Sequence, residues 1–203
     1  MDRVLNSEGV KQIFRFSEFT DYWQQYTYGD LFKVSTIRNI EISKKRILSA
    51  SQMFGMVARE DIEIDIKFEE NSTRTYKLVL PGDYVIHLRS FQGGFAFSEQ
   101  EGICSPAYTI LRPTPLLKYA FLKDYFMSDR FIKTLKLVTY GIRDGRSINT
   151  EEFLKLSKRI PSLEEQSKIN EMLVAIEDKI HNESDIYSFI IKQKQYLLKQ
   201  MFI

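Results

Sequence analysis

The sequence has few of the residues from which metal centres and disulfides are built. It contains one cysteine, Cys104, and two histidines, His87 and His181. A single cysteine excludes an internal disulfide framework and fits a reducing compartment. Because one cysteine and two distant histidines lack the spacing of a zinc site, no metal site is expected.

Long apolar runs and the motifs of common active sites are missing as well. No stretch approaches the roughly 18 apolar residues of a membrane span, and the first residues, MDRVLNSEGVKQ, lack the apolar core of a secretion signal. There is no phosphate-binding P-loop, no GxSxG elbow and no GxGxxG fingerprint. We therefore expect a cytoplasmic protein with no membrane partner, no catalytic residue and no cofactor of its own.

Charge is nearly balanced overall, at +2, but it is unevenly distributed. Residues 33–59 hold six basic side chains and one acidic side chain, and residues 112–158 hold ten and five. An acidic segment at 60–70 lies between them. Two basic regions that met in the fold would attract phosphates. The alternative is ordinary solvated surface charge.

Short alternating segments predict a mixed α+β globular part over residues 1–160. The aromatic run FSEFTDYW, residues 16–23, predicts a folded N-terminal anchor. Strands are expected at 62–68 (where an amphipathic helical turn is the alternative), 76–80, 84–88 and 106–112. Helices are expected at 116–126 and 129–140, and a turn-rich segment at 141–153 leads into a further short helix.

Residues 161–203 predict one long helix. Pro161 disfavours helix at the residue before it, and Ser162 with Glu165 three residues later forms the pattern of a capping box. No glycine or proline follows before Met201. At 1.5 Å per residue the helix would be about 58 Å long.

Apolar residues recur along this helix with a strict 4,3 spacing, which predicts a coiled coil. The seam positions are Ile169, Leu173, Ile176, Ile180, Glu183, Tyr187, Ile190, Lys194, Leu197 and Met201. Two of them are polar, and Glu183 of one helix could approach Lys194 of another if the two were antiparallel. Ile186, Ile191 and Leu198 widen the apolar stripe. The alternative is a helix that lies across its own domain.

Three segments carry the side chains that DNA recognition uses. Glycines in the first segment, 89–94, would allow close approach to a DNA backbone. The basic third segment, 44–46, suits phosphates more than bases. The candidates are Arg89, Ser90, Gln92, Gly93 and Gly94; Arg143, Arg146 and Ser147; and Lys44, Lys45 and Arg46. For each segment, local ion pairs or plain solvation are the alternative.

Several stretches, taken together and in order, resemble one family, the specificity (S) subunits of type I restriction-modification systems. IPSLEEQSKINEML resembles the start of the family's spacer helix, and YLLKQMF resembles its end. The stretch FRFSEFTDYWQQYTYGDLF is similar to the family's first segment. Two further stretches resemble its middle and the part before the spacer helix, LPGDYVIHLRSFQGGFAFSEQEGICSPAYTIL and GIRDGRSINTEEFLKL.

The resemblance implies a DNA target recognition domain followed by a spacer helix, in a protein that is not an enzyme. Its partners would be double-stranded DNA, the modification (methyltransferase) subunits and, through the complex, the restriction subunit. S-adenosylmethionine, ATP and magnesium would belong to those partners. The runner-up hypothesis is a scaffold that binds modification subunits without reading DNA.

Members of the family usually carry two such units, with antiparallel helices, whereas this sequence holds one. It is therefore expected to be a half-size subunit, a truncated product or an expressed half. Two copies could pair their helices as a homodimer, or one copy could pair with a different half. A homodimer would read a symmetric, interrupted palindrome.

Overall fold

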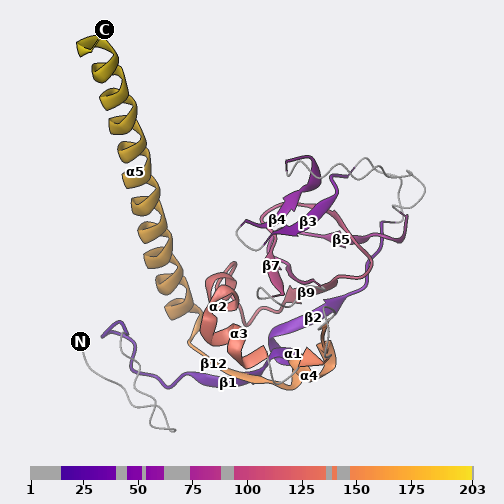
Figure 1. Ribbon diagram of the computed structural model, residues 1–203. Helices are drawn as coiled ribbons and strands as arrows, with labels where there is room; N and C mark the ends of the chain where they lie inside the picture. The colour runs from indigo at the N-terminus through magenta and orange to yellow at the C-terminus, as the bar shows by residue number, and fades with distance from the viewer. Residues whose placement is uncertain are drawn as a thin grey trace.

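The computed structural model describes residues 15–39, 45–51, 54–61, 74–87, 94–135, 139–140 and 147–202. These residues form a globular part of short strands and helices and one long C-terminal helix that projects from it (Figure 1). The expected fold class, mixed α+β with a long terminal helix, is confirmed. The strand or helical turn expected at 62–68 lies outside the described residues.

A four-stranded antiparallel sheet lies at the centre of the globular part. Its order is β2 (Phe32–Ser35), β9 (Thr109–Pro113), β6 (Tyr84–Ile86) and β7 (Phe95–Phe97). Successive residues of a strand point to opposite faces, and both faces of this sheet are covered. Tyr84 and Ile86 therefore contact one hydrophobic cluster, while Val85 between them contacts the other.

The remaining strands form two-stranded ladders around this sheet. The pairs are β3 (Leu48–Ser51) with β4 (Gly55–Ala58), β5 (Lys77–Val79) with β8 (Gly102–Cys104), β10 (Thr139–Tyr140) with β11 (Ser147–Ile148), and β1 (Gln24–Thr27) with β12 (Ser157–Ile160). A 3-10 turn, η1 (Arg59–Asp61), follows β4. The pairing of β1 with β12 brings the two ends of the globular part together.

Aromatic rings fill the larger of the two clusters. Phe153 stacks on Tyr28 at 4.5 Å between ring centroids, and Phe126 lies 4.5 Å from Phe131. The smaller cluster, on the other face, includes Leu48, Ile110 and the buried Cys104. Burial raises the pKa of the Cys104 thiol to about 12, so this cysteine is an unreactive core residue.

In the described part of the chain, four short helices pack against the sheet. They are α1 (Tyr28–Leu31), α2 (Lys123–Met127), α3 (Asp129–Leu135) and α4 (Thr150–Lys155). The helix expected at 116–126 forms only at its end. Ala120 adopts a φ of 61°, which an α-helix does not allow. The Leu116 carbonyl and the Lys118 N–H form hydrogen bonds with the Gln166 side chain instead of within a helix. The helix expected at 129–140 stops at Leu135, and Thr139 already belongs to β10.

The predicted long helix is confirmed as α5 (Leu163–Met201), with Ser162 as its N-cap. The Ser162 hydroxyl accepts a hydrogen bond from the Glu165 N–H at 3.3 Å. The expected capping box is only half formed, because the Glu165 side chain turns into the globular part. Within the described ranges, no helix has the length and apolar character that crossing a membrane requires.

Candidate nucleic-acid interface and spacer helix

Two of the predicted DNA-binding loops start from strand ends that lie close together in the structure. These strand ends are called the loop anchors. The loop that contains Arg89 connects β6 to β7, and His87 N–H donates to the Gly94 carbonyl at 2.8 Å across its base. The loop that contains Arg143 and Arg146 connects β10 to β11.

These two anchors meet at one end of the central sheet. Thr150, two residues beyond β11, donates to the Thr109 hydroxyl at 3.5 Å, and Thr109 pairs with Ile86 at the end of β6. Ile86, Phe95 and Ile148 also share the aromatic cluster. Of the candidates in these loops, Gly94 and Ser147 are described, whereas Arg89, Ser90, Gln92, Gly93, Arg143 and Arg146 lie outside the described residues.

The third predicted segment lies at the opposite end of β7 and is occupied by local ion pairs. Arg46 contacts Glu60 at 2.6 Å and Asp61 at 3.1 Å, and Lys45 pairs with Glu101. A hydrogen bond to Glu60 raises the pKa of the Arg46 guanidinium. A phosphate would have to displace these carboxylates, so the geometry favours the local-pair alternative for Lys45 and Arg46. Lys44 is not among the described residues.

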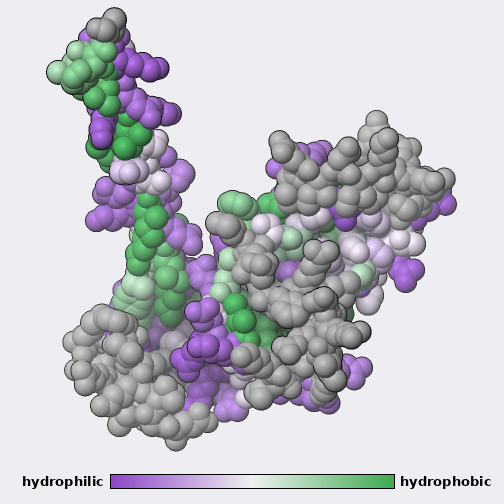
Figure 2. Space-filling view, in the orientation of Figure 1, coloured by the Kyte–Doolittle hydropathy of each residue, from purple (hydrophilic) through white to green (hydrophobic). Residues whose placement is uncertain are grey.

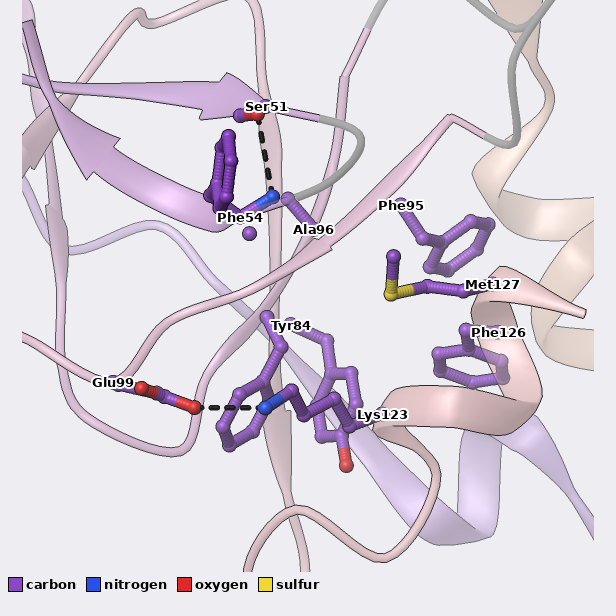
Figure 3. A pocket seen from close by; sticks show the side chains of 11 residues that line it. Ser51, Phe54, Tyr84, Phe95, Ala96, Glu99, Lys123, Phe126 and Met127 are labelled. Atoms are coloured by element: carbon purple, nitrogen blue, oxygen red, sulfur yellow. Dashed lines mark hydrogen bonds and ion pairs between the residues drawn. The ribbon is translucent and has the colours of Figure 1, made fainter. Parts of the chain in front are cut away.

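A cavity of about 250 Å³ lies between the tip of the β3–β4 hairpin and α2 (Figure 3). Phe54 projects from the hairpin tip, and Met127 and Phe126 line the side formed by α2. At the rim, Lys123 donates to Glu99 at 2.9 Å. This cation is therefore neutralised, and the cavity suits an apolar side chain better than a phosphate.

The root of α5, residues 163–173, is held to the globular part by a buried ion pair. Arg15 donates to both carboxylate oxygens of Glu165, at 2.7 and 2.8 Å, and Trp23 Nε1–H donates to the same carboxylate at 3.2 Å. The side chains of Arg15 and Glu165 are 4% and 2% exposed. The hydrogen bond to Glu165 raises the pKa of the Arg15 guanidinium. The predicted N-terminal aromatic anchor thus packs at the root of the helix.

Gln166 adds three hydrogen bonds at the same place. Its amide oxygen accepts from Lys118 N–H at 2.8 Å, and its amide nitrogen donates to the carbonyls of Leu116 at 3.0 Å and Pro161 at 3.1 Å. One turn further on, Asn170 donates to the Tyr119 carbonyl at 2.9 Å. Sequence reasoning found the Glu-Gln pair as a motif but missed its partners, which lie about 50 and 150 residues away in the chain.

The rest of the helix, residues 174–202, is the arm. Its seam residues from Ile176 onward are exposed, with Ile180 at 64% and Met201 at 72%, whereas Ile169 and Leu173 at the root are half-buried. Figure 2 shows apolar surface along the visible face of α5. The alternative of a helix lying across its own domain is therefore wrong for the arm.

A second apolar feature lies off the seam. Phe189 and Tyr196 are seven residues apart and 59% and 63% exposed. In the heptad they share a position roughly on the far side of the helix from the seam. The arm thus offers two separate faces.

No group of three or more histidine, cysteine, aspartate or glutamate side chains in the described parts of the chain is placed to hold a metal ion. The seven-residue seam repeat and the anchored root define the class of architecture as a globular domain with an outward spacer helix.

Several solved structures share this architecture. An S subunit of a type I restriction-modification system from M. genitalium superposes with a TM-score of 0.55 at 15% identity, over 89% of this chain and 46% of its own. A chain from a structure of complex assembly and conformational transition in the type I R-M system gives 0.54 at 17%, over 88% and 43%. The HsdS subunit from Thermoanaerobacter tengcongensis gives 0.50 at 18%, over 79% and 38%.

The chain therefore has the fold of type I S subunits, and the resemblance seen in the sequence is confirmed at the level of the fold. It spans less than half the length of each of these structures. No protein-family model matches the sequence, and no curated protein matches it.

Proposed function

We propose that this chain is a non-catalytic DNA specificity subunit of a cytoplasmic type I restriction-modification complex. The globular part, residues 1–160, would read one half of a split DNA site, and residues 161–203 would pair with a second helix. The observation that carries this proposal is the shared fold with S subunits over most of the chain, including the long helix. Methyl transfer and ATP-driven cleavage, with their cofactors, would belong to partner subunits.

The end of the sheet that carries the Arg89 and Arg143 loops is the proposed reading surface. Loops on a rigid scaffold commonly carry recognition, and here two loops from distant parts of the sequence start from neighbouring anchors. Arginine and glutamine side chains in them match the groups that read base edges in the major groove.

Pairing through the arm would give the second half-site. An antiparallel pair in which Ile176 meets Met201 uses the whole exposed seam, since these residues begin and end it. Glu183 and Lys194 each lie seven residues in from those ends, so this register places them opposite each other. Opposite charges at polar seam positions specify register and orientation. The partner would be a second copy or a different half.

Modification subunits would dock on the face of the arm that carries Phe189 and Tyr196. Exposed aromatic residues are enriched where proteins bind each other. Replacing both with serine should abolish co-purification with the modification subunit while leaving the mass of the homodimer unchanged. Co-purification of the double variant at the wild-type level would show that modification subunits do not dock on this face.

Selection from a random duplex library tests the reading of DNA, with binding measured over a range of salt concentrations. A specificity subunit should enrich one sequence and show a steep decrease of affinity with salt, because phosphate contacts release counterions. The competing function, a scaffold that does not read DNA, is favoured by the neutralised Arg46. It predicts no enriched sequence and a shallow salt slope.

A further inference from the structure

The contacts at the root of α5 are of an unusual kind for a helix that leaves a domain. A helix is generally held by apolar packing, which tolerates small rotations because it has no preferred direction. Here the two most buried residues of α5 are Glu165 and Gln166, each 1% exposed. Their hydrogen bonds are directional and weaken steeply when the angle changes.

These bonds reach two separate segments of the globular part. Glu165 binds Arg15 and Trp23 from the N-terminal segment, and Arg15 is itself fixed by donating to the Asp21 carbonyl at 2.6 Å. Gln166 binds the backbone of the segment before α2, at Leu116 and Lys118. Two bracing directions on consecutive residues limit both the tilt of the helix and its rotation about its own axis.

The length of the arm magnifies any error at the root. Over a rod of about 58 Å, a tilt of about 10° moves the far end by about 10 Å. One base pair of duplex DNA spans about 3.4 Å. A loosely held root would therefore blur the separation of two recognition domains by several base pairs.

We infer that Arg15, Glu165 and Gln166 form an orienting clamp that fixes the direction of α5 and, resting on the proposed function, determines the spacer length between the two DNA half-sites. These are positioning residues. They lie at the root of the helix and act on the target only through the direction that they give to the arm.

Pulsed EPR distance measurement between the globular part and the arm tests the clamp directly. Spin labels at Ala107→Cys and Lys192→Cys report the direction of α5, since both positions are exposed. The native Cys104 is buried and its thiol stays protonated, so it escapes labelling. Dilution with excess unlabelled chain removes distances between copies. The wild-type clamp should give one narrow distance distribution.

Glu165→Gln and Gln166→Ala should each widen that distribution about two-fold or shift its maximum. The matched controls Glu164→Gln and Ser167→Ala should leave it unchanged, because Glu164 is exposed and the Ser167 hydroxyl donates to the Leu163 carbonyl of its own helix. Circular dichroism confirms that each variant is folded. If both clamp variants fold and keep the wild-type distribution, the clamp does not orient the helix.

Methylation by the complex with modification subunits tests the consequence for spacing. Clamp variants should also accept spacers one base pair longer or shorter, with the same half-site sequences. A loosened arm with an unchanged spacer would overturn the assignment of spacer length to the clamp. Absence of methylation with the wild-type chain would instead refute the proposed function, and the EPR result would still decide whether the clamp orients α5.

Discussion

The globular part and the arm treat their apolar residues in opposite ways. In the globular part, rings such as Phe126, Phe131 and Phe153 are 0–2% exposed and contact one another. In the arm, large apolar side chains are 46–78% exposed along most of its length. The globular part buries these large apolar side chains within one chain. The arm has a regular apolar seam that the chain itself leaves exposed. Substitutions in the two regions should therefore change different properties.

The largest effect is expected from Ile176→Asp in the seam. Burying two isoleucine side chains contributes about 3–6 kcal/mol to a symmetric pair, so the substitution should weaken association at least about 100-fold. Sedimentation or light scattering would show loss of the paired mass, with unfolding of the globular part unchanged. Lys192→Asp, on the opposite side of the helix, is the control. An unchanged mass for Ile176→Asp would contradict pairing through this seam.

The converse change is Phe153→Ala in the aromatic cluster. This residue is 0% exposed and stacks on Tyr28. Its truncation should lower the free energy of unfolding by about 3–5 kcal/mol, measured by urea denaturation, without changing the affinity of helix pairing. Leu163→Ala, at an exposed position on α5, should change stability much less. Equal losses in the two variants would mean that the cluster is not the main source of stability.

A third comparison concerns DNA binding by two groups of arginines, those of the proposed reading surface and Arg46 at the opposite end of β7. Arg143→Ala or Arg146→Ala should weaken DNA binding by about 1–3 kcal/mol, and a base-contacting arginine would also relax specificity at one position. Arg46→Ala should have the smaller effect, because Glu60 and Asp61 already neutralise that guanidinium. Fluorescence anisotropy with the selected duplex measures all three. The opposite order would move the reading surface to the Arg46 end.

The smallest effect concerns pH and a lysine beside the root of α5. Lys158 lies 3.6 Å from the centre of the Tyr125 ring, and burial lowers its pKa to about 8, against about 10.4 for an unfolded lysine. Between these values the unfolded chain binds more protons, so the free energy of unfolding should rise with pH. Lys158→Met should lack this rise in urea denaturation between pH 8 and pH 10. Identical pH profiles would contradict it.

The sequence predicted the parts of the fold that depend on local patterns. The limits of α5 follow from Pro161, the Ser162 cap and an unbroken heptad repeat. The first part of the helix expected at 116–126 does not form, because the Gln166 side chain, about 50 residues further on, binds the Leu116 carbonyl and the Lys118 N–H. A partner that distant leaves no local signal.

The candidate site shows the same limit. A capping box was the local interpretation of Ser162 and Glu165, but Arg15, 150 residues away, binds the Glu165 carboxylate. Likewise, six basic residues between 33 and 59 gave no sign that Arg46 would meet Glu60 and Asp61. Charge counts along a chain do not report which charges the fold neutralises.

Mapping methylated sites across a genome, after co-expression of this chain with its modification subunit, is the decisive test of whether paired copies of the chain read DNA. Recognition by two identical domains on paired arms predicts methylation at an interrupted palindrome with one fixed spacer length. An interrupted but asymmetric site would show that a different half supplies the second domain. Stable co-purification without any methylated site would contradict DNA recognition by this chain and would make it a scaffold that reads no DNA.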